Sequence, residues 1–327
     1  MFILSLNIFL LSFLINLIIT KQAIKIKYIT RNGISQLGGV TIWFSFLLVS
    51  LSILIYERYQ FLHFKEILGI FICSTLIFVI GLIDDKKELS VSIKFLTQLA
   101  ITVIVMIFGV RTQIVGMGVF GNTVVTLLWI LGVTNAFNHL DIVDGLSSGI
   151  AFISTLTFYI FSIITLNIPV ALILIALAGS ILGFFRYNFP SGRIYMGNSG
   201  SHFLGFLLST LAITISYATL ERRIALIIPL LVLGFPIFDT LFVIWVRLLK
   251  HKPVWSKSND HLALKLISMG FPKKKVVIYM FLLAILFSAS AVFILFLSNI
   301  MSFMVLLLLI TMCIYIAFRV KGRINER

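Results

Sequence analysis

The chain has 327 residues, of which 60% are hydrophobic and 11% are charged, and its formal net charge is +15. Apolar stretches near 20 residues recur from end to end, and each is long enough to cross a hydrocarbon core of roughly 30 Å. This composition excludes a soluble globular protein. It also argues against nucleic acid as a partner, because the basic residues cluster between apolar stretches in the manner of membrane proteins.

The hydropathy pattern predicts an all-α, polytopic membrane protein with about eleven transmembrane helices, forming a single integral-membrane domain over residues 1–327. We interpret the first span as a retained helix, because it lacks a basic N-terminal region and a small-residue cleavage site. The predicted spans lie near residues 2–20, 37–56, 67–83, 95–110, 123–138, 147–166, 169–186, 202–220, 224–249, 276–297 and 300–319.

The connections between the spans differ in charge. The odd-numbered connections and the C-terminus together hold 21 of the 26 Lys and Arg residues. The positive-inside rule therefore predicts an inner (cytoplasmic) membrane protein with its N-terminus outside and its C-terminus in the cytoplasm. All six aspartates lie at the cytoplasmic ends or in the cytoplasmic loops of this topology, so we expect an active site at the cytoplasmic face. The basic stretch 23–31 is expected to lie near anionic lipid.

Adjacent Asp84 and Asp85 follow the third span. Two neighbouring carboxylates repel each other, so a site that keeps both ionised needs a cation, and hard oxygen ligands suit Mg²⁺. Lys94 opens the next span and is placed to meet a phosphate. The structural alternative is a solvated turn in which the two carboxylates cap the following helix.

Four polar residues recur every third position at the end of the fifth span, where on a helix each neighbours the next along one stripe. They are Asn135, Asn138, Asp141 and Asp144. Ionisable groups at membrane depth cost roughly 2.5–3.5 kcal/mol each on insertion scales, so they usually face protein, water or a ligand. The alternative is a helix that leaves the bilayer with its acids in water and a turn at Asp144-Gly145.

A polar segment links the seventh and eighth spans. The run from Gly197 through Asn198 to Ser201 opens a helix, and amides at a helix N-terminus attract anions such as phosphate. Arg193 adds a charge that grips phosphate oxygens in two places, and Tyr195 is suited to stack on a planar base. The alternative is a Gly-rich turn with Ser201 as an N-cap and Tyr195 in an interfacial aromatic belt.

Two further features lie towards the C-terminus. Asp239 lies deep within an apolar segment, where a carboxylate indicates function by default, although pairing with an Arg or Lys from another helix is an equal alternative. Asp260 and His261 precede Lys265 in the long basic loop 250–275, and loops of this size are commonly functional or disordered. A single His is more often incidental than catalytic, so His261 needs support from elsewhere.

Together and in this order, these motifs resemble the polyprenyl-phosphate N-acetylhexosamine-1-phosphate transferase superfamily. The family pattern has an Asp-Asp motif, N-A-x-N-x-x-D-G-x-D-G-L, a G-D-x-G-S turn and a His-rich cytoplasmic loop. The resemblance implies transfer of a sugar-1-phosphate from a UDP-sugar to polyprenyl (undecaprenyl) phosphate in cell-envelope glycan synthesis, with UMP released and Mg²⁺ required. It implies membrane, UDP-sugar and lipid phosphate as partners, without nucleic acid, and it allows a homodimer.

The resemblance also implies roles for single residues. Asp84 would be a general base, or an orienter, for the attacking lipid phosphate, and Asp85 would be a carboxylate on the Mg²⁺ side. The nucleotide-sugar pocket would be lined by Asn135, Asn138, Asp141 and Asp144, and Asp144 would also be catalytic. Lys94 and His261 would contact the diphosphate, with His261 as a catalytic residue. Tyr195 would stack on uracil, Asn198 would contact the metal, and Arg193 and Asp239 would contact the substrate.

Two departures from the family pattern matter. The G-D-x-G-S aspartate, a magnesium ligand, is Asn198 here, which keeps an amide oxygen but removes one negative charge. The family's H-x-H-H-R segment reads His261 to Lys265 and keeps one His of three. A smaller departure is Ile142, where the family usually has Gly. These changes leave three options: an active enzyme with a different sugar specificity, a slow enzyme, or an inactive homologue.

Two other hypotheses compete with the transferase. The first is a non-catalytic relative that binds polyprenyl phosphate or nucleotide-sugar and partners another enzyme; the retained carboxylates argue against it. The second is a lipid or ion transporter. A transporter predicts polar residues on both sides of the bilayer and interrupted helices in repeats, whereas the aspartates here lie on one predicted side.

Overall fold

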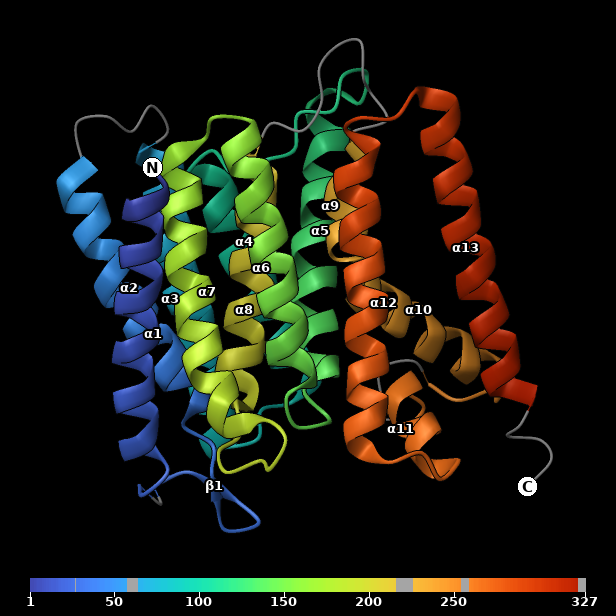
Figure 1. Ribbon diagram of the computed structural model, residues 1–327, viewed down its shortest axis with the longest axis horizontal. Helices are drawn as coiled ribbons and strands as arrows, with labels where there is room; N and C mark the ends of the chain where they lie inside the picture. The colour runs from blue at the N-terminus through green and yellow to red at the C-terminus, as the bar shows by residue number, and fades with distance from the viewer. Residues whose placement is uncertain (27, 58–63, 216–225, 254–258, 323–327) are drawn as a thin grey trace. The chain divides into compact units, whose positions relative to one another are not determined.

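The computed structural model describes residues 1–26, 28–57, 64–215, 226–253 and 259–322. These residues are almost entirely helical, with one two-stranded hairpin (Figure 1). They form two compact units, unit 1 over Met1–Ser216 and unit 2 over Tyr217–Arg327. That both belong to one integral-membrane domain stays a prediction.

The elements follow one another in a simple order. Unit 1 contains α1 (Phe2–Ala23), β1 (Thr30–Arg31), β2 (Ile34–Ser35), α2 (Gly38–Glu57), α3 (Phe64–Lys86), α4 (Val91–Ile107), α5 (Gly118–Leu140), α6 (Leu146–Ile164), α7 (Ile168–Asn188) and α8 (Gly197–Thr214). Unit 2 contains α9 (Ile228–Val232), α10 (Gly234–Leu249), α11 (Leu262–Ser268), α12 (Lys273–Ile294) and α13 (Asn299–Gly322).

Each predicted span overlaps a helix, which confirms a helical, polytopic membrane protein. Within the described residues, eight helices are long and apolar enough to cross a membrane, namely α1, α2, α3, α5, α6, α7, α12 and α13. The predicted span 224–249 differs, because its helix breaks at Leu233 into α9 and α10. Parts of this span and of 202–220 lie outside the described residues. Eleven crossings therefore stay a prediction.

The centre of unit 1 is formed by α7 and α8. Helix α7 packs against α1, α2 and α6, whereas α8 packs against α2, α3, α5 and α6. Every side chain from Ser199 to Ala212 of α8 is buried. Because α8 is enclosed by other helices, its first turn, which carries the predicted Asn198 motif, is held at a fixed place in unit 1.

Small residues allow α1 and α7 to approach each other closely. A Cβ atom added to Gly183 of α7 would lie 2.8 Å from Cβ of Asn16 in α1, and one added to Gly179 would meet Ser12. Glycine at such positions lets helix backbones pack closely inside a membrane. Asn16 also joins α1 to α2, because its Nδ2 donates a hydrogen bond to Oγ of Ser45 at 3.0 Å.

The hairpin β1–β2 carries the chain from α1 to the site. Thr30 pairs with Ser35 in antiparallel register, and the turn residues Asn32 and Gly33 have φ of 52° and 76°. Asn-Gly is the preferred sequence for such a two-residue turn, since both positions need a positive φ. Past the hairpin, the carbonyl of Ser35 accepts the Tyr195 amide at 2.9 Å. The hairpin thereby holds the segment before α8.

Unit 2 is built around α12, which packs against α9, α10, α11 and α13. Gly234 begins α10 where an added Cβ would crowd the ring of Phe287 in α12. Five residues further along α10, Asp239 is 1% exposed. The apolar face of α10 therefore carries one buried carboxylate into the interior of this unit.

The α1–α7 contact generates a stability prediction. We expect Gly183→Val to lower the free energy of unfolding by about 1–3 kcal/mol, because extra methyl groups in a well-packed core force the helices apart. Gly132→Val is the matched control, since a Cβ added at that position of α5 meets nothing within 4 Å. Thermal unfolding of the full chain in detergent measures both. Equal midpoints for the two variants would contradict the close contact.

Candidate active site

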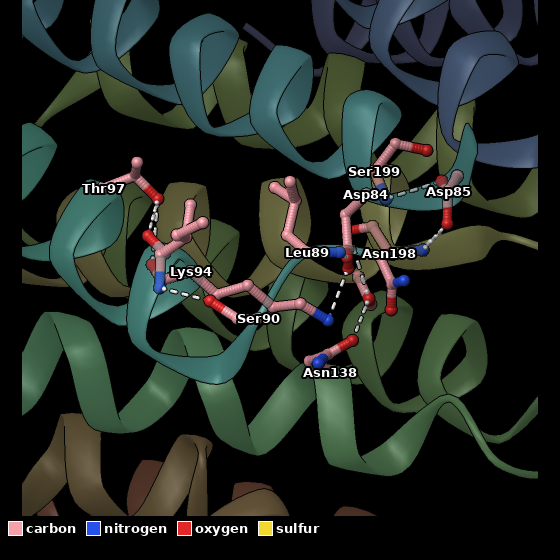
Figure 2. A network of polar contacts seen from close by, with 11 residues as sticks. Asp84, Asp85, Leu89, Ser90, Lys94, Thr97, Asn138, Asn198 and Ser199 are labelled. Carbon is pink, nitrogen blue, oxygen red and sulfur yellow. Dashed lines mark hydrogen bonds and ion pairs between the residues drawn. The ribbon is translucent and has the colours of Figure 1, made fainter. Parts of the chain in front are cut away.

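The first turn of α8 is capped by Asp85, which lies at the end of α3. Oδ1 of Asp85 accepts the Asn198 amide at 2.7 Å, and Oδ2 accepts the Ser199 amide at 3.0 Å (Figure 2). The first amides of a helix lack partners inside the helix, and the helix dipole favours an anion there. Asp85 therefore satisfies the N-terminus of α8 with a carboxylate from another helix.

This contact revises one sequence interpretation. The amides at the start of α8 were expected to attract phosphate, but the amides of Asn198 and Ser199 already bind a carboxylate of the chain itself. Glycines make the contact fit: Gly197 has φ of +75°, and a Cβ added there would lie 2.6 Å from Oδ2 of Asp85. A Cβ added to Gly81 of α3 would likewise lie 2.5 Å from Cα of Ser199.

Asp84 holds Lys94 across the turn between α3 and α4. Its Oδ2 lies 2.8 Å from Nζ of Lys94, and its Oδ1 accepts the Leu89 amide at 2.8 Å. The Asp84 side chain is 1% exposed, whereas that of Lys94 is 22% exposed. The carboxylate is therefore enclosed, while the Lys94 side chain keeps part of its surface exposed and its ammonium group has further donors for an anion.

The amides of α5 join the same cluster. Figure 2 shows Lys94 extending from α4 towards Asp84, with Asn138 and Asn198 beside them. Oδ1 of Asn138 accepts the Ser201 hydroxyl at 3.0 Å, which links α5 to α8. Deeper along α5, Nδ2 of Asn135 donates to Gln98 of α4 at 2.8 Å. The two Asn residues of the predicted stripe therefore face protein and make polar contacts between helices. The continuation of the stripe on a helix was wrong for Asp141 and Asp144, which lie in the turn after α5, as the alternative with a turn at Asp144-Gly145 predicted.

The aspartates after α5 add negative charge. Asp141 follows Leu140, the last residue of α5, and its carboxylate accepts the Gly197 amide. Desolvation raises the pKa of Asp141 to about 7, with further contributions from the charges of Asp85 and Asp144, while Arg31 opposes the shift. The raised pKa of Asp141 therefore reports mainly the burial of its carboxyl group, to which the two neighbouring carboxylates add.

The loop between α7 and α8 shapes the other side of this charge cluster. A Cβ added to Gly192 would lie 2.6 Å from Oδ2 of Asp144, so this glycine permits the approach of the carboxylate. Tyr195 is half-buried and Arg193 is exposed. The carbonyl of Tyr195 accepts the Gly38 amide at 3.0 Å, which fixes the backbone next to the predicted base-stacking ring.

Three residues of unit 1 add to the predicted set. Asn188 ties the Asp144-Gly145 turn to the loop, because its Oδ1 accepts the Gly145 amide at 2.7 Å and its Nδ2 donates to the Ile194 carbonyl. Arg31 acts on Asp141 from the hairpin. His202 lies one turn beyond Asn198 and is 3% exposed, and among the described residues its Nε2 has no hydrogen-bond partner.

Sequence spacing gave no signal for Asn188. Arg31 lay in a stretch assigned to the lipid surface, and His202 lay inside an apolar run. An Asp or Asn motif can be recognised from its spacing in the sequence. Asn188, Arg31 and His202, in contrast, come close to the site only through tertiary packing.

In unit 2 the structure joins Asp239 and His261. Nδ1 of His261 lies 2.7 Å from Oδ2 of Asp239, and both residues are buried. The structural alternative for Asp239 was pairing with an Arg or Lys, but the contact found is with a histidine. Next to it, Oδ1 of Asp260 binds Nζ of Lys250 at 2.7 Å and of Lys265 at 2.8 Å.

The side chains of unit 1 offer donors of the kind that Mg²⁺ prefers. Within the described residues, no three His, Cys, Asp or Glu side chains are arranged to hold a metal ion. Mg²⁺, however, is usually held by one or two carboxylates, with waters and substrate phosphates completing its shell. Each oxygen of Asp85 keeps a further acceptor site beside its amide contact, and Asn198 contributes an amide oxygen. Together with the negative charge around Asp141, this donor set fits Mg²⁺.

Comparison with known proteins covers this same region. Residues 67–216 match the family model described as glycosyl transferase family 4, a range that includes the described site of unit 1 from Asp84 to His202. The chain is 31% identical over 260 residues to a probable undecaprenyl-phosphate N-acetylglucosaminyl 1-phosphate transferase of Bacillus subtilis, covering 77% of this chain and 72% of that protein. The chain belongs to glycosyl transferase family 4.

Two other relatives show how the similarity is distributed along the chain. An undecaprenyl-phosphate alpha-N-acetylglucosaminyl 1-phosphate transferase of Thermotoga maritima is 30% identical over 267 residues, covering 77% of each chain. A phospho-N-acetylmuramoyl-pentapeptide-transferase of Streptococcus mutans is 39% identical over 89 residues, which cover 27% of this chain and 26% of that protein. The resemblance inferred from the motifs is confirmed.

The Asp85 cap generates a second prediction. We expect Asp85→Ala to lower the free energy of unfolding by about 0.5–2 kcal/mol, because two amides of α8 lose their acceptor. Hydrogen exchange at the Asn198 and Ser199 amides should accelerate. Lys86→Ala is the control, since Lys86 contacts only an exposed partner, Tyr28, in the hydrogen bonds of the described residues. Unchanged exchange at both amides in Asp85→Ala would refute the cap.

Proposed function

We propose that this protein transfers a sugar-1-phosphate from a UDP-sugar to polyprenyl phosphate, giving polyprenyl-diphosphate-sugar and UMP. Membership of glycosyl transferase family 4 supports this proposal, as do two relatives named for N-acetylglucosaminyl 1-phosphate transfer. The observation that carries it is the polar cluster at one end of unit 1, where the Asp85 cap and the Asp84–Lys94 ion pair lie beside Asn138 and Asn198.

Lys94 is proposed to bind phosphate oxygens. Phosphoryl transfer depends on positioning and charge neutralisation more than on covalent help from the protein. Asp84 holds the Lys94 ammonium at 2.8 Å, and the partial exposure of Lys94 leaves donors for an anion. Because both oxygens of Asp84 are engaged and enclosed, an orienting role suits this geometry better than that of a general base.

The nucleotide-sugar is proposed to bind on the side of the α7–α8 loop. Tyr195 offers a half-buried ring beside a fixed backbone, and Arg193 is exposed and able to reach phosphate. Asp141 and Asp144 would accept hydrogen bonds from sugar and ribose hydroxyls. Asp85 and Asn198 would hold Mg²⁺, whose role when bound is to neutralise the developing charge on the diphosphate.

The membrane orientation is part of the proposal. The distribution of Lys and Arg supports an N-terminus outside and a C-terminus in the cytoplasm, with the Asp84–Asp85 end of unit 1 at the cytoplasmic face. Such a placement gives the site access to a soluble nucleotide-sugar and to a lipid phosphate held in the inner leaflet.

The proposed reaction is tested by UMP release. Purified protein would receive polyprenyl phosphate, Mg²⁺ and a panel of UDP-N-acetylhexosamines, with UDP-GlcNAc first. We expect UMP from at least one donor and its loss in Asp84→Asn and Asp85→Asn, with Lys86→Ala as an active control. Only variants that remain folded by thermal unfolding are compared. If folded wild-type protein releases no UMP from any donor, the result would contradict the transferase and support the hypothesis of a non-catalytic relative.

Asn198 generates a separate prediction about the metal. We expect Asn198→Asp to retain activity and to lower the Mg²⁺ concentration that gives half the maximal rate, because a carboxylate binds a hard divalent cation more strongly than an amide oxygen does. The measurement is a Mg²⁺ titration of UMP release for both proteins. An unchanged Mg²⁺ requirement would remove Asn198 from the proposed metal shell.

A further inference from the structure

His202, in the second turn of α8, is a buried imidazole with an unsatisfied nitrogen. The residue is 3% exposed, and its Nε2 has no hydrogen-bond partner among the described residues. Buried polar groups of folded proteins are almost always hydrogen-bonded, so an exception calls for a physical reason. An ionisable side chain inside an apolar helix also indicates function by default. His202 is therefore a candidate for contact with a bound ligand.

The geometry of α8 places His202 next to the site of unit 1. His202 and Asn198 are four residues apart, so they lie on the same face of α8, with His202 one helical turn further from the capped end. Asn198 lies beside Asp84 and Lys94 (Figure 2). The charges of Asp84 and Lys94 both act on His202, and so does His139 near the end of α5. The imidazole therefore lies within electrostatic reach of the Asp84–Lys94 ion pair.

Other polar side chains occur one turn deeper than the site on the neighbouring helices. Gln98 follows Lys94 by one turn on α4, and Asn135 precedes Asn138 by about one turn on α5. Nδ2 of Asn135 donates a hydrogen bond to Oε1 of Gln98 at 2.8 Å. These two amides bind each other, whereas Nε2 of His202 binds nothing within the part of the chain that the structure describes. His202 therefore retains a polar atom that a ligand can satisfy.

The ligand that suits this place is a phosphate carried by a lipid. Lys94 is a partly exposed cation whose ammonium group keeps donors for an anion. Phosphate oxygens accept hydrogen bonds, so an Nε2–H group on His202 would supply a second kind of donor to the same anion. The nucleotide-sugar is proposed to bind at the α7–α8 loop, before α8 begins. A phosphate one turn deeper suits a molecule whose tail partitions into the apolar layer.

We propose that His202 is a further substrate-binding residue, whose Nε2–H donates a hydrogen bond to the phosphate of polyprenyl phosphate beside Lys94. The identity of this lipid as a substrate rests on the proposed function, whereas the binding of its phosphate requires no transfer. Because Nε2 is unsatisfied within the described chain, its hydrogen bond is gained only in the complex and favours the bound state.

The contact is tested by NMR without turnover. In the full chain labelled with ¹⁵N-histidine, the His202 signals are assigned among those of the five histidines by their loss in His202→Gln. We expect farnesyl phosphate to shift the His202 Nε2 signal towards that of a hydrogen-bonded N–H, and farnesol, which lacks the phosphate, to leave it unchanged. No shift with farnesyl phosphate would overturn the inference. An equal shift with UMP or inorganic phosphate would assign the site to another phosphate source and overturn the lipid assignment.

Substitutions separate ligand contact from a structural role. We expect His202→Leu to weaken farnesyl phosphate binding about 10-fold, because a hydrogen bond to a charged group is lost. His202→Gln should weaken it less than about threefold, because the Gln amide can replace the Nε2 donor. UDP-GlcNAc binding should not change in either variant. Thr210→Val is the matched control, since it removes a buried hydroxyl that bonds only within α8.

Calorimetric titration in detergent measures these affinities, on variants whose thermal unfolding matches that of the wild type. Equal losses in His202→Leu and His202→Gln, or a parallel loss of UDP-GlcNAc binding, would indicate a structural role and refute the contact. The NMR experiment on the wild type decides the inference even if His202→Leu fails to fold.

The results also separate this inference from the proposed function. A wild-type protein in which farnesyl phosphate shifts His202 but which releases no UMP would refute the transferase and leave the phosphate contact intact. UMP release with an unaltered His202 signal would refute the contact alone. If both proposals hold, His202→Leu should raise KM for polyprenyl phosphate about 10-fold and leave KM for the UDP-sugar unchanged.

Discussion

The bond between the Asp85 carboxylate and the first amides of α8 is the interaction on which the site of unit 1 depends. It joins the end of α3 to the most enclosed helix of the unit and satisfies two donors that an isolated helix would leave unpaired. Next to it, Asp84 pairs with Lys94, and Asn138 of α5 accepts the hydroxyl of Ser201 in α8. A carboxylate for which the family resemblance implies a role near Mg²⁺ is thus also part of the framework of unit 1.

Much of this arrangement could be predicted from sequence. Apolar runs located the helices, and polar motifs at their ends located the cluster. The hydrogen bonds of Asp85 to α8 could not be predicted, because they join residues 113 positions apart and neither motif contains a signal for the other. The position of Arg31 could not be predicted for a related reason. A basic residue near a membrane helix usually contacts lipid headgroups, whereas the Asn-Gly hairpin places Arg31 where its charge acts on Asp141.

Unit 2 explains one departure from the family pattern. His261 lacked support in the sequence, and Asp239 supplies it through a buried contact that no spacing rule links. Ala263 occupies a position where the family pattern has a histidine, and it is 1% exposed at the start of α11. A histidine there would need a buried polar partner. Instead, α11 packs an apolar face against α12, and the one remaining histidine, His261, is paired with the Asp239 carboxylate.

The long separation between Asp85 and α8 also bears on biogenesis. At synthesis rates of about 5–20 residues per second, the α8 amides leave the ribosome roughly 6–23 s after the acidic pair. Until then Asp85 ends α3 without the amides that later hold it, whereas Asp84 has the nearby Leu89 amide and Lys94 as partners. Completion of this site therefore waits for the synthesis of α8, and a nascent chain arrested before α8 would carry the acidic motif without the amides that bind Asp85.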